Sequence, residues 1–150
     1  GVADMVPITV ILLLAFLIGD IIGDLGTASY LSNLIKGASI SPTILPLIIF
    51  LVSSIISFST GTSWGTFSIM MPIALFIGAE FNIYLPLIVG SVISGGIFGD
   101  HISPISDTTI ISSMASGCDH IAHVETQMPY ALISASIASI LYLIFGYIYT

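Results

Sequence analysis

The segment GDHISPISDTT, residues 99–109, interrupts a chain that is otherwise strongly apolar. The apolar run IYLPLIVGSVISGGIF precedes it, and another long apolar run follows soon afterwards. Pro104 fixes its own backbone angle φ and disfavours helix at Ser103, so a helix should end here. Ser106 and Asp107 are good N-cap residues, because their side chains accept hydrogen bonds from free backbone N–H groups. The segment therefore predicts a helix, a break and a second, shorter helix.

The composition is that of an integral membrane protein. Hydrophobic residues make up 56% of the 150 residues and charged residues only 6%, against about 25% charged in typical soluble domains. A soluble domain with so few charges would expose large apolar patches, so we expect the lipid bilayer as a partner. Eight acidic residues face a single basic one, Lys36. This balance argues against nucleic acid as a partner and is compatible with handling cations.

Four hydrophobic blocks lie along the chain, at about residues 6–22, 42–77, 83–115 and 128–149. The first and last blocks fit one crossing each, because a spanning helix needs roughly 20 apolar residues. The two middle blocks are too long for one crossing and are polar in the middle. Each is either a re-entrant hairpin or a crossing whose helix unwinds halfway, and both place the polar break inside a protein cavity. Four ordinary helices joined by ordinary loops are the third alternative.

The segment STGTSWGT, residues 59–66, interrupts the second block. Both arms beside it are short, which favours a helical hairpin over about residues 42–79. The stretch after Pro104 is too short and too rich in hydroxyls to span alone, which favours a discontinuous helix over about residues 83–115. The end of its first half should be loosened by three glycines, Gly95, Gly96 and Gly99. Paired broken segments are typical of one half of an inverted-repeat transporter.

Asp100 and Asp107 are the main candidate ligands for an ion. A charge at the bilayer centre costs about 2.5–3.5 kcal/mol on insertion scales, so such a residue usually has a functional or pairing role. The sequence offers no well-placed basic residue to neutralise either carboxylate. A carboxyl group that alternates between a proton and a metal cation is the chemistry an ion-coupled carrier needs. The alternative is that Asp107 is only a helix N-cap and Asp100 only a loop residue.

Hydroxyl groups at both breaks could complete a cation site, because hard cations prefer oxygen ligands. The alternative for each hydroxyl is a bond to its own backbone, which is common at helix ends. His101 could relay protons or orient an aspartate, or it could simply line a cavity. The candidate ion-binding and coupling residues are Asp100, Asp107, Ser103, Ser106, Thr108, His101, Ser59, Thr60, Thr62 and Ser63.

Other polar residues have competing interpretations. Asp20 could line a cavity, whereas Asp24 fits a solvated interfacial acid. Trp64 could gate the site or only fill space. The segment CDHIAHVE, residues 118–125, invites a zinc interpretation, but one Cys and a loose acidic flank fit a solvated loop better. The sequence has no phosphate-binding loop and no nucleophile elbow, so we expect a protein that is not an enzyme and uses no cofactor.

Four segments together resemble the C-terminal half of the NhaC-type Na+/H+ antiporter family in their order and spacing. They are IIGDLGTASYL, SFSTGTSWGTFSIMMPIA, GGIFGDHISPISDTTIISS and GCDHIAHVETQMPYA, and the resemblance covers about residues 20–131. It implies a secondary transporter of the wider ion transporter superfamily, in which each repeat carries a re-entrant hairpin followed by a broken helix. Residues 1–150 would then form a single membrane domain, the C-terminal repeat, whose partner is the N-terminal half of the same transporter.

We therefore expect an all-α, multi-pass protein of the cell membrane, most simply a prokaryotic plasma membrane. Its expected function is Na+/H+ antiport, with Na+ competing with H+ for Asp100 and Asp107, so that both ions are transported rather than held as cofactors. The resemblance leaves open a Na+- or H+-coupled carrier of an amino acid or organic anion on the same fold. A non-transporting structural fragment is a third reading. A homodimer is possible, and no nucleic acid is expected to bind.

Overall fold

The structure, a computed structural model, describes residues 40–149 continuously and, before them, residues 10, 13, 17, 21, 24–26, 30, 33–35 and 37. Asp20, Lys36 and most of the first hydrophobic block lie outside these described residues. The elements in chain order are η1 (Pro42–Ile44), α3 (Leu45–Thr60), α4 (Ser63–Glu80), α5 (Leu85–Ile102), α6 (Asp107–Ser116) and α7 (His120–Tyr149). No strand occurs between residues 40 and 149, so the predicted all-α class is confirmed.

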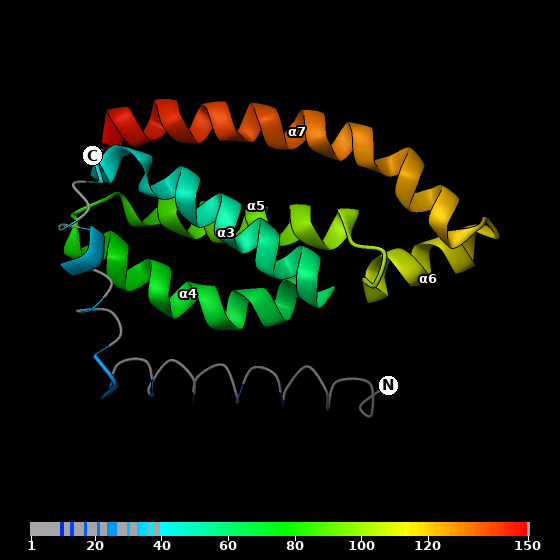
Figure 1. Ribbon diagram of the computed structural model, residues 1–150, viewed down its shortest axis with the longest axis horizontal. Coiled ribbons are helices and arrows are strands. Elements are labelled where there is room, and N and C mark those ends of the chain that lie inside the picture. The colour runs from blue at the N-terminus through cyan, green and yellow to red at the C-terminus, as the bar shows by residue number, and fades with distance from the viewer. Residues whose placement is uncertain are drawn as a thin grey trace.

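Three of the described helices are long and apolar enough to cross a membrane: Pro42–Thr60, Leu85–Ile102 and His120–Tyr149. The 30 residues of α7 give it a length of about 45 Å, at 1.5 Å per residue. Only 11% of its apolar window is buried. In Figure 1, α7 accordingly lies at the edge of the bundle, alongside α3 and α5.

Helices α3 and α4 form a helical hairpin with a tight tip at Gly61 and Thr62. Gly61 ends α3 in the left-handed conformation, with φ of 67°, which glycine adopts without a steric penalty. Thr62 then caps α4, because its side chain accepts a hydrogen bond from the backbone N–H of Gly65. The tip is shorter than the predicted break over residues 59–66, since helix continues to Thr60 and resumes at Ser63.

The second break separates α5 from α6. Helix α5 ends at Ile102, the next four residues are not helical, and α6 begins at Asp107. Ser106 caps α6 by accepting a hydrogen bond from the backbone N–H of Thr109 over 3.3 Å, as its residue type predicts. The predicted order of helix, break and shorter helix is therefore observed.

Helix α5 packs closely against α3 through glycines. A Cβ atom added at Gly95 would collide with the backbone carbonyl of Phe50, and one added at Gly99 would collide with that of Ser54. Such spacing of small residues lets two helix backbones approach each other. The prediction that these glycines loosen α5 is therefore wrong, because α5 stays helical to Ile102 and the glycines serve helix packing instead.

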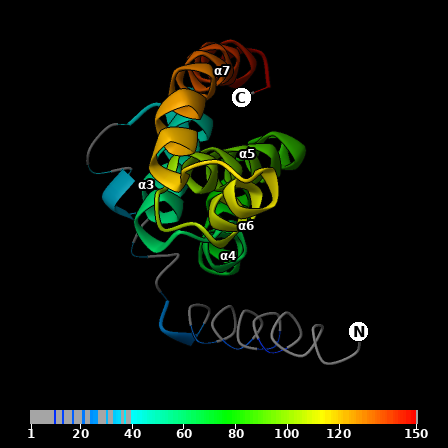
Figure 2. The same cartoon turned by 90° about the vertical axis from the view of Figure 1, so that its right-hand side faces the viewer.

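The hairpin tip and the break between α5 and α6 meet at one end of the bundle (Figure 1). A Cβ added at Gly61 would lie 2.6 Å from the carbonyl oxygen of Ile105, so the tip touches the break directly. Figure 2 looks onto this end, with α6 in front of α4 and α5. The apolar core lies between α3, α4 and α5 and consists of Leu45, Ile49, Met70, Ala74, Ile77, Ile83, Ile88 and Val92.

Candidate functional site

Asp100, in the last turn of α5, is 3% exposed and is the one buried charged residue among those described. Its carboxylate lies within reach of three hydroxyl groups. Ser63 donates to Oδ2 over 3.1 Å from the first turn of α4. Ser106 donates to Oδ1 over 2.6 Å from the break, and Thr108 donates to Oδ2 over 3.2 Å from the first turn of α6. Both helix breaks therefore contribute to one carboxylate.

In the described part of the chain, no Lys or Arg neutralises this carboxylate, and the groups that donate hydrogen bonds to it are uncharged hydroxyls. Lys36 is the chain's single Lys or Arg and lies outside that part. Each hydrogen bond to a charged group contributes roughly 1.5–3 kcal/mol, so the three hydroxyl donors offset part of the cost of burying this carboxylate. The arrangement is an all-oxygen cluster around one negative charge, which is the ligand type that hard cations prefer.

The hydroxyl of Ser106 is the centre of this cluster. It donates to Asp100, accepts from the backbone N–H of Thr109, and lies 2.8 Å from the Oγ1 atom of Thr108. Because the Ser106 proton is used on Asp100, the single Thr108 proton can satisfy either Ser106 or Asp100, but not both at once. The capping of α6 and the solvation of the carboxylate thus depend on the same side chain.

The other four predicted hydroxyl residues make no hydrogen bond to the Asp100 carboxylate. Ser103 is fully buried and donates to the carbonyl of Phe58 over 2.8 Å, which ties the break to the end of α3. Ser59 and Thr60 are exposed and donate to carbonyls of their own helix, so they do not contact Asp100. Thr62, as the cap of α4, positions the neighbouring Ser63 rather than the carboxylate itself.

Asp107 and His101 are both exposed, and neither makes a hydrogen bond to Asp100 in the described part of the chain. Asp107 is exposed in the first turn of α6, where its Oδ1 accepts from the backbone N–H of Thr108 over 2.7 Å. A negative charge at a helix N-terminus is stabilised by the helix dipole. The exposed His101 has its Nδ1 atom 2.9 Å from the carbonyl of Ile97, and no contact joins its ring to Asp100. No group of three His, Cys, Asp or Glu residues within the described ranges could hold a metal.

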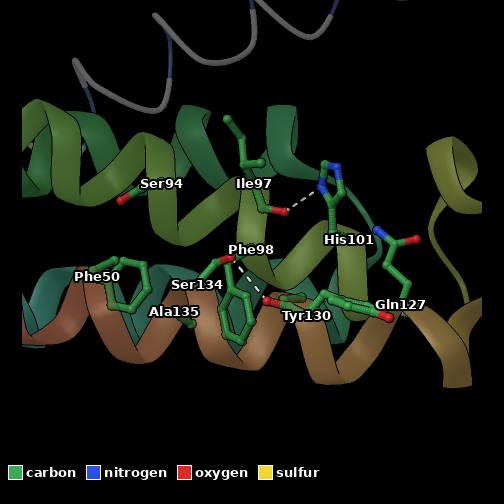
Figure 3. A pocket seen from close by; sticks show the side chains of 11 residues that line it. Phe50, Ser94, Ile97, Phe98, His101, Gln127, Tyr130, Ser134 and Ala135 are labelled. Carbon is green, nitrogen blue, oxygen red and sulfur yellow. Dashed lines mark hydrogen bonds between the residues drawn. The ribbon is translucent and has the colours of Figure 1, made fainter.

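His101 instead lines a groove of about 440 Å³ between α5 and α7. Figure 3 shows His101 and Gln127 at one end of the groove, with Phe98 and Tyr130 beside them. Asp100 does not line this groove, so the hydroxyl cluster around Asp100 and this groove are separate features. Trp64 is 53% exposed and packs edge-on against Phe67, away from the groove lining. Its role as a gate stays a prediction.

Sequence reasoning missed the contribution of His120. Residues 118–125 were predicted to be a solvated loop, but α7 already begins at His120, capped by the Asp119 side chain through the N–H of Ala122. The loop prediction is therefore wrong from His120 onwards. The Nε2 atom of His120 lies 2.7 Å from the carbonyl oxygen of Pro104 in the break. Gly117 followed by an aspartate is a helix stop and start signal that could have revealed this boundary.

Comparison with known proteins places these features in context. The family model described as the Na+/H+ antiporter family matches residues 1–147. An uncharacterized protein of Haemophilus influenzae is 45% identical over 152 residues, covering 100% of this chain and 29% of that protein. The malate-2H(+)/Na(+)-lactate antiporter of Bacillus subtilis is 38% identical over 110 residues, covering 73% of this chain and 24% of that antiporter. An uncharacterized Na(+)/H(+) antiporter of Haemophilus influenzae is 36% identical over 112 residues, covering 72% and 23% respectively.

The chain spans between 23% and 29% of the length of these three relatives. The family match nevertheless covers both helix breaks and the carboxylate between them. No solved structure is significantly similar to the chain.

Proposed function

This chain belongs to the Na+/H+ antiporter family, and on that premise we propose that it forms the ion-coupling part of a secondary antiporter that exchanges Na+ for H+. The family consists of multi-pass membrane transporters rather than enzymes, which agrees with the three apolar helices long enough to span a bilayer. Asp100 is the proposed residue at which the two ions compete.

The observation that carries this proposal is the buried carboxylate shared by the two helix breaks. Asp100 is held by hydroxyls of Ser63, Ser106 and Thr108, and no Lys or Arg is available among the described residues to neutralise it. A permanently ionised, unpaired carboxylate at membrane depth is costly, whereas one that always carries either a proton or a metal cation is not. Alternation between these two states is the essence of antiport.

The hydroxyls support both states because they can rotate. When Asp100 carries a proton, the hydroxyls around it donate to its free lone pairs or accept a hydrogen bond from that proton. Ser63, Ser106 and Thr108 lie at its two oxygens. When Na+ binds, the same hydroxyls turn so that their oxygen lone pairs, together with the Asp100 carboxylate, face the ion. When Asp100 is protonated, it loses the charge that attracts the cation. The exposed Asp107 in the first turn of α6 adds negative charge next to two of these hydroxyls and completes the proposed pair of ionic residues.

A topology follows from the same proposal. The α3–α4 hairpin would be re-entrant, α5 and α6 would form one discontinuous crossing, and the whole would be one half of an inverted repeat completed by an N-terminal half. The contact between Gly61 and Ile105 supports this topology, because it brings the hairpin tip to the helix break. Movement of one half against the other would expose Asp100 to alternate sides.

A second candidate function is supported by one of the relatives. The Bacillus subtilis relative is named a malate-2H(+)/Na(+)-lactate antiporter, so an organic anion could be the solute that this chain couples to Na+ or H+. An amino acid is a further candidate on the same fold. In either case Asp100 would retain its role in ion coupling, and a separate group would hold the solute.

Transport by the full-length protein in liposomes distinguishes these functions. A Na+ gradient that moves protons without any organic solute supports Na+/H+ antiport. Proton movement that requires added malate, lactate or an amino acid supports the second function. Absence of all of these activities in well-folded, reconstituted protein would contradict both.

A further inference from the structure

We propose that His120 is a positioning residue for the ion site, resting on the proposed role of Asp100. Its ring would fix the break between α5 and α6 in the conformation that brings Ser106 and Thr108 to the carboxylate. The residue lies at the first position of α7, outside the cluster itself, and it contacts none of the three hydroxyls.

The ring of His120 contacts both ends of the segment that carries these hydroxyls. Its Nε2 atom lies 2.7 Å from the carbonyl oxygen of Pro104, two residues before Ser106. Its Nδ1 atom lies 3.1 Å from the Oγ atom of Ser113, well inside α6. Within the described residues, no backbone N–H donates to the Pro104 carbonyl, so the ring of His120 is its protein hydrogen-bond partner.

Hydrogen-bond chemistry fixes which nitrogen carries the proton. A carbonyl oxygen only accepts, so Nε2 must be the donor to Pro104. In the neutral ring, Nδ1 can then only accept from the Ser113 hydroxyl, whose single proton is otherwise donated to the carbonyl of Ile110. In the protonated ring, Nδ1 donates instead, and the Ser113 hydroxyl turns to the carbonyl of Ile110, which lies 2.8 Å away. Both contacts therefore persist in either charge state of the ring and hold the segment in place.

These contacts link α7 to the carboxylate. The other end of α7 is packed against η1, which directly precedes α3, and a Cβ added at Gly146 would collide with the carbonyl of Thr43 there. Tyr149 also stacks on Tyr84 at the start of α5, with ring centroids 5.2 Å apart. A helix fixed at that end carries His120 in a defined place beside the break. The position of Ser106 thus depends on a residue that is 14 positions further along the chain.

Substitutions that restore one contact at a time test this inference. The amide nitrogen of Gln extends about as far as Nε2 of His and can donate to Pro104, whereas that of Asn extends only as far as Nδ1. In reconstituted full-length protein, we expect His120→Ala and His120→Asn to raise the KM for Na+ roughly tenfold, as loss of an outer partner of a metal site does. We expect His120→Gln to stay within about twofold of the wild type, and all three to keep a nearly unchanged maximal rate.

His123→Ala is the matched control, because His123 lies one turn further along α7 and its ring makes no hydrogen bond among the described residues. An unchanged KM for Na+ in His120→Ala would overturn the inference. An equal rise in this KM in the Gln and Asn variants would also overturn it, because the effect would then come from packing and not from the hydrogen bond to Pro104. If His120→Ala fails to fold, the comparison of Gln with Asn decides. Asp100→Asn is measured in parallel. Normal Na+/H+ exchange by this variant contradicts the proposed function. If Asp100→Asn loses exchange but the His120 variants exchange normally, only the positioning role of His120 is contradicted.

Discussion

Ser63, the first residue of α4, donates a hydrogen bond of 3.1 Å to the Oδ2 atom of Asp100, which is 37 positions away in the last turn of α5. This single contact joins the tip of the α3–α4 hairpin to the end of a helix that stops at a break. It turns two interruptions in an apolar sequence into one polar cluster.

Replacing Ser63 with alanine removes one of the three donors to Asp100. We expect the KM for Na+ to rise at least about tenfold, because the Ser63 oxygen is one of the proposed ligands of Na+ and a hydrogen-bonding contact to a charged group is worth about 1.5–3 kcal/mol. The measurement is Na+-driven proton movement in liposomes at a series of Na+ concentrations. Ser59→Ala is the control, since Ser59 is exposed and donates only to the carbonyl of Ile55 in its own helix. Equal effects of the two substitutions would show that Ser63 has no special role.

Gly61→Ala tests the contact between the hairpin tip and the break. Gly61 has φ of 67° and an added Cβ would collide with the backbone of Ile105. Gly117 has nearly the same backbone angle, 65°, but no atom lies within 4 Å of an added Cβ. Each substitution should lower the free energy of unfolding by roughly 1–2 kcal/mol, because alanine is strained in the left-handed conformation. Only Gly61→Ala should lower the stability further and reduce transport, because only its added Cβ collides with a neighbouring backbone.

Thermal unfolding in detergent and transport in liposomes measure the two consequences separately. If Gly61→Ala and Gly117→Ala are equally stable and equally active, then the tip does not need its close approach to Ile105. That result would remove the physical basis for joining the two breaks in one site.

Gly99→Ala tests the packing of α5 on α3. An added Cβ would collide with the α3 backbone at Ser54, and overpacking of this kind typically costs about 1–3 kcal/mol. Gly90→Ala is a control in the same helix, where an added Cβ would meet only the Tyr142 hydroxyl at 3.5 Å, an ordinary contact. Alanine is a better helix former than glycine by about 1 kcal/mol, so Gly90→Ala should raise the unfolding temperature and Gly99→Ala should lower it. The opposite order would mean that the two helices are not in close contact.

Much of the fold follows from local signals that the sequence shows directly. Pro104 with Ser106 predicts the helix break and the cap of α6, and both are present because they depend on neighbouring residues alone. Gly61 with Thr62 marks the hairpin tip for the same reason, although helix extends closer to the tip than predicted. Local backbone chemistry is therefore sufficient to place the interruptions.

Which residues form the site is decided by contacts between segments that lie far apart in the sequence. The sequence offered ten candidate residues, but it could not separate Ser63, which reaches Asp100, from Ser59 and Thr60, which bond their own helix. All three have the same chemistry, and only the packing of α4 against α5 distinguishes them. The glycines of α5 were misinterpreted for a related reason, since close helix packing and helix loosening require the same residue type. His120 was missed because its partners lie in the break, 16 positions earlier.

Proton release on Na+ binding is the measurement that tests the central claim most directly. Na+ is added to the purified full-length protein in weakly buffered solution, and the proton released is followed with a pH indicator. Because Na+ and H+ compete for the same carboxylate in this account, binding of Na+ should release protons. Asp100→Asn should release no proton on addition of Na+, while Glu125→Gln, which removes an exposed acid of α7, should behave like the wild type. Undiminished proton release from Asp100→Asn would contradict the assignment of Asp100 as the residue shared by Na+ and H+.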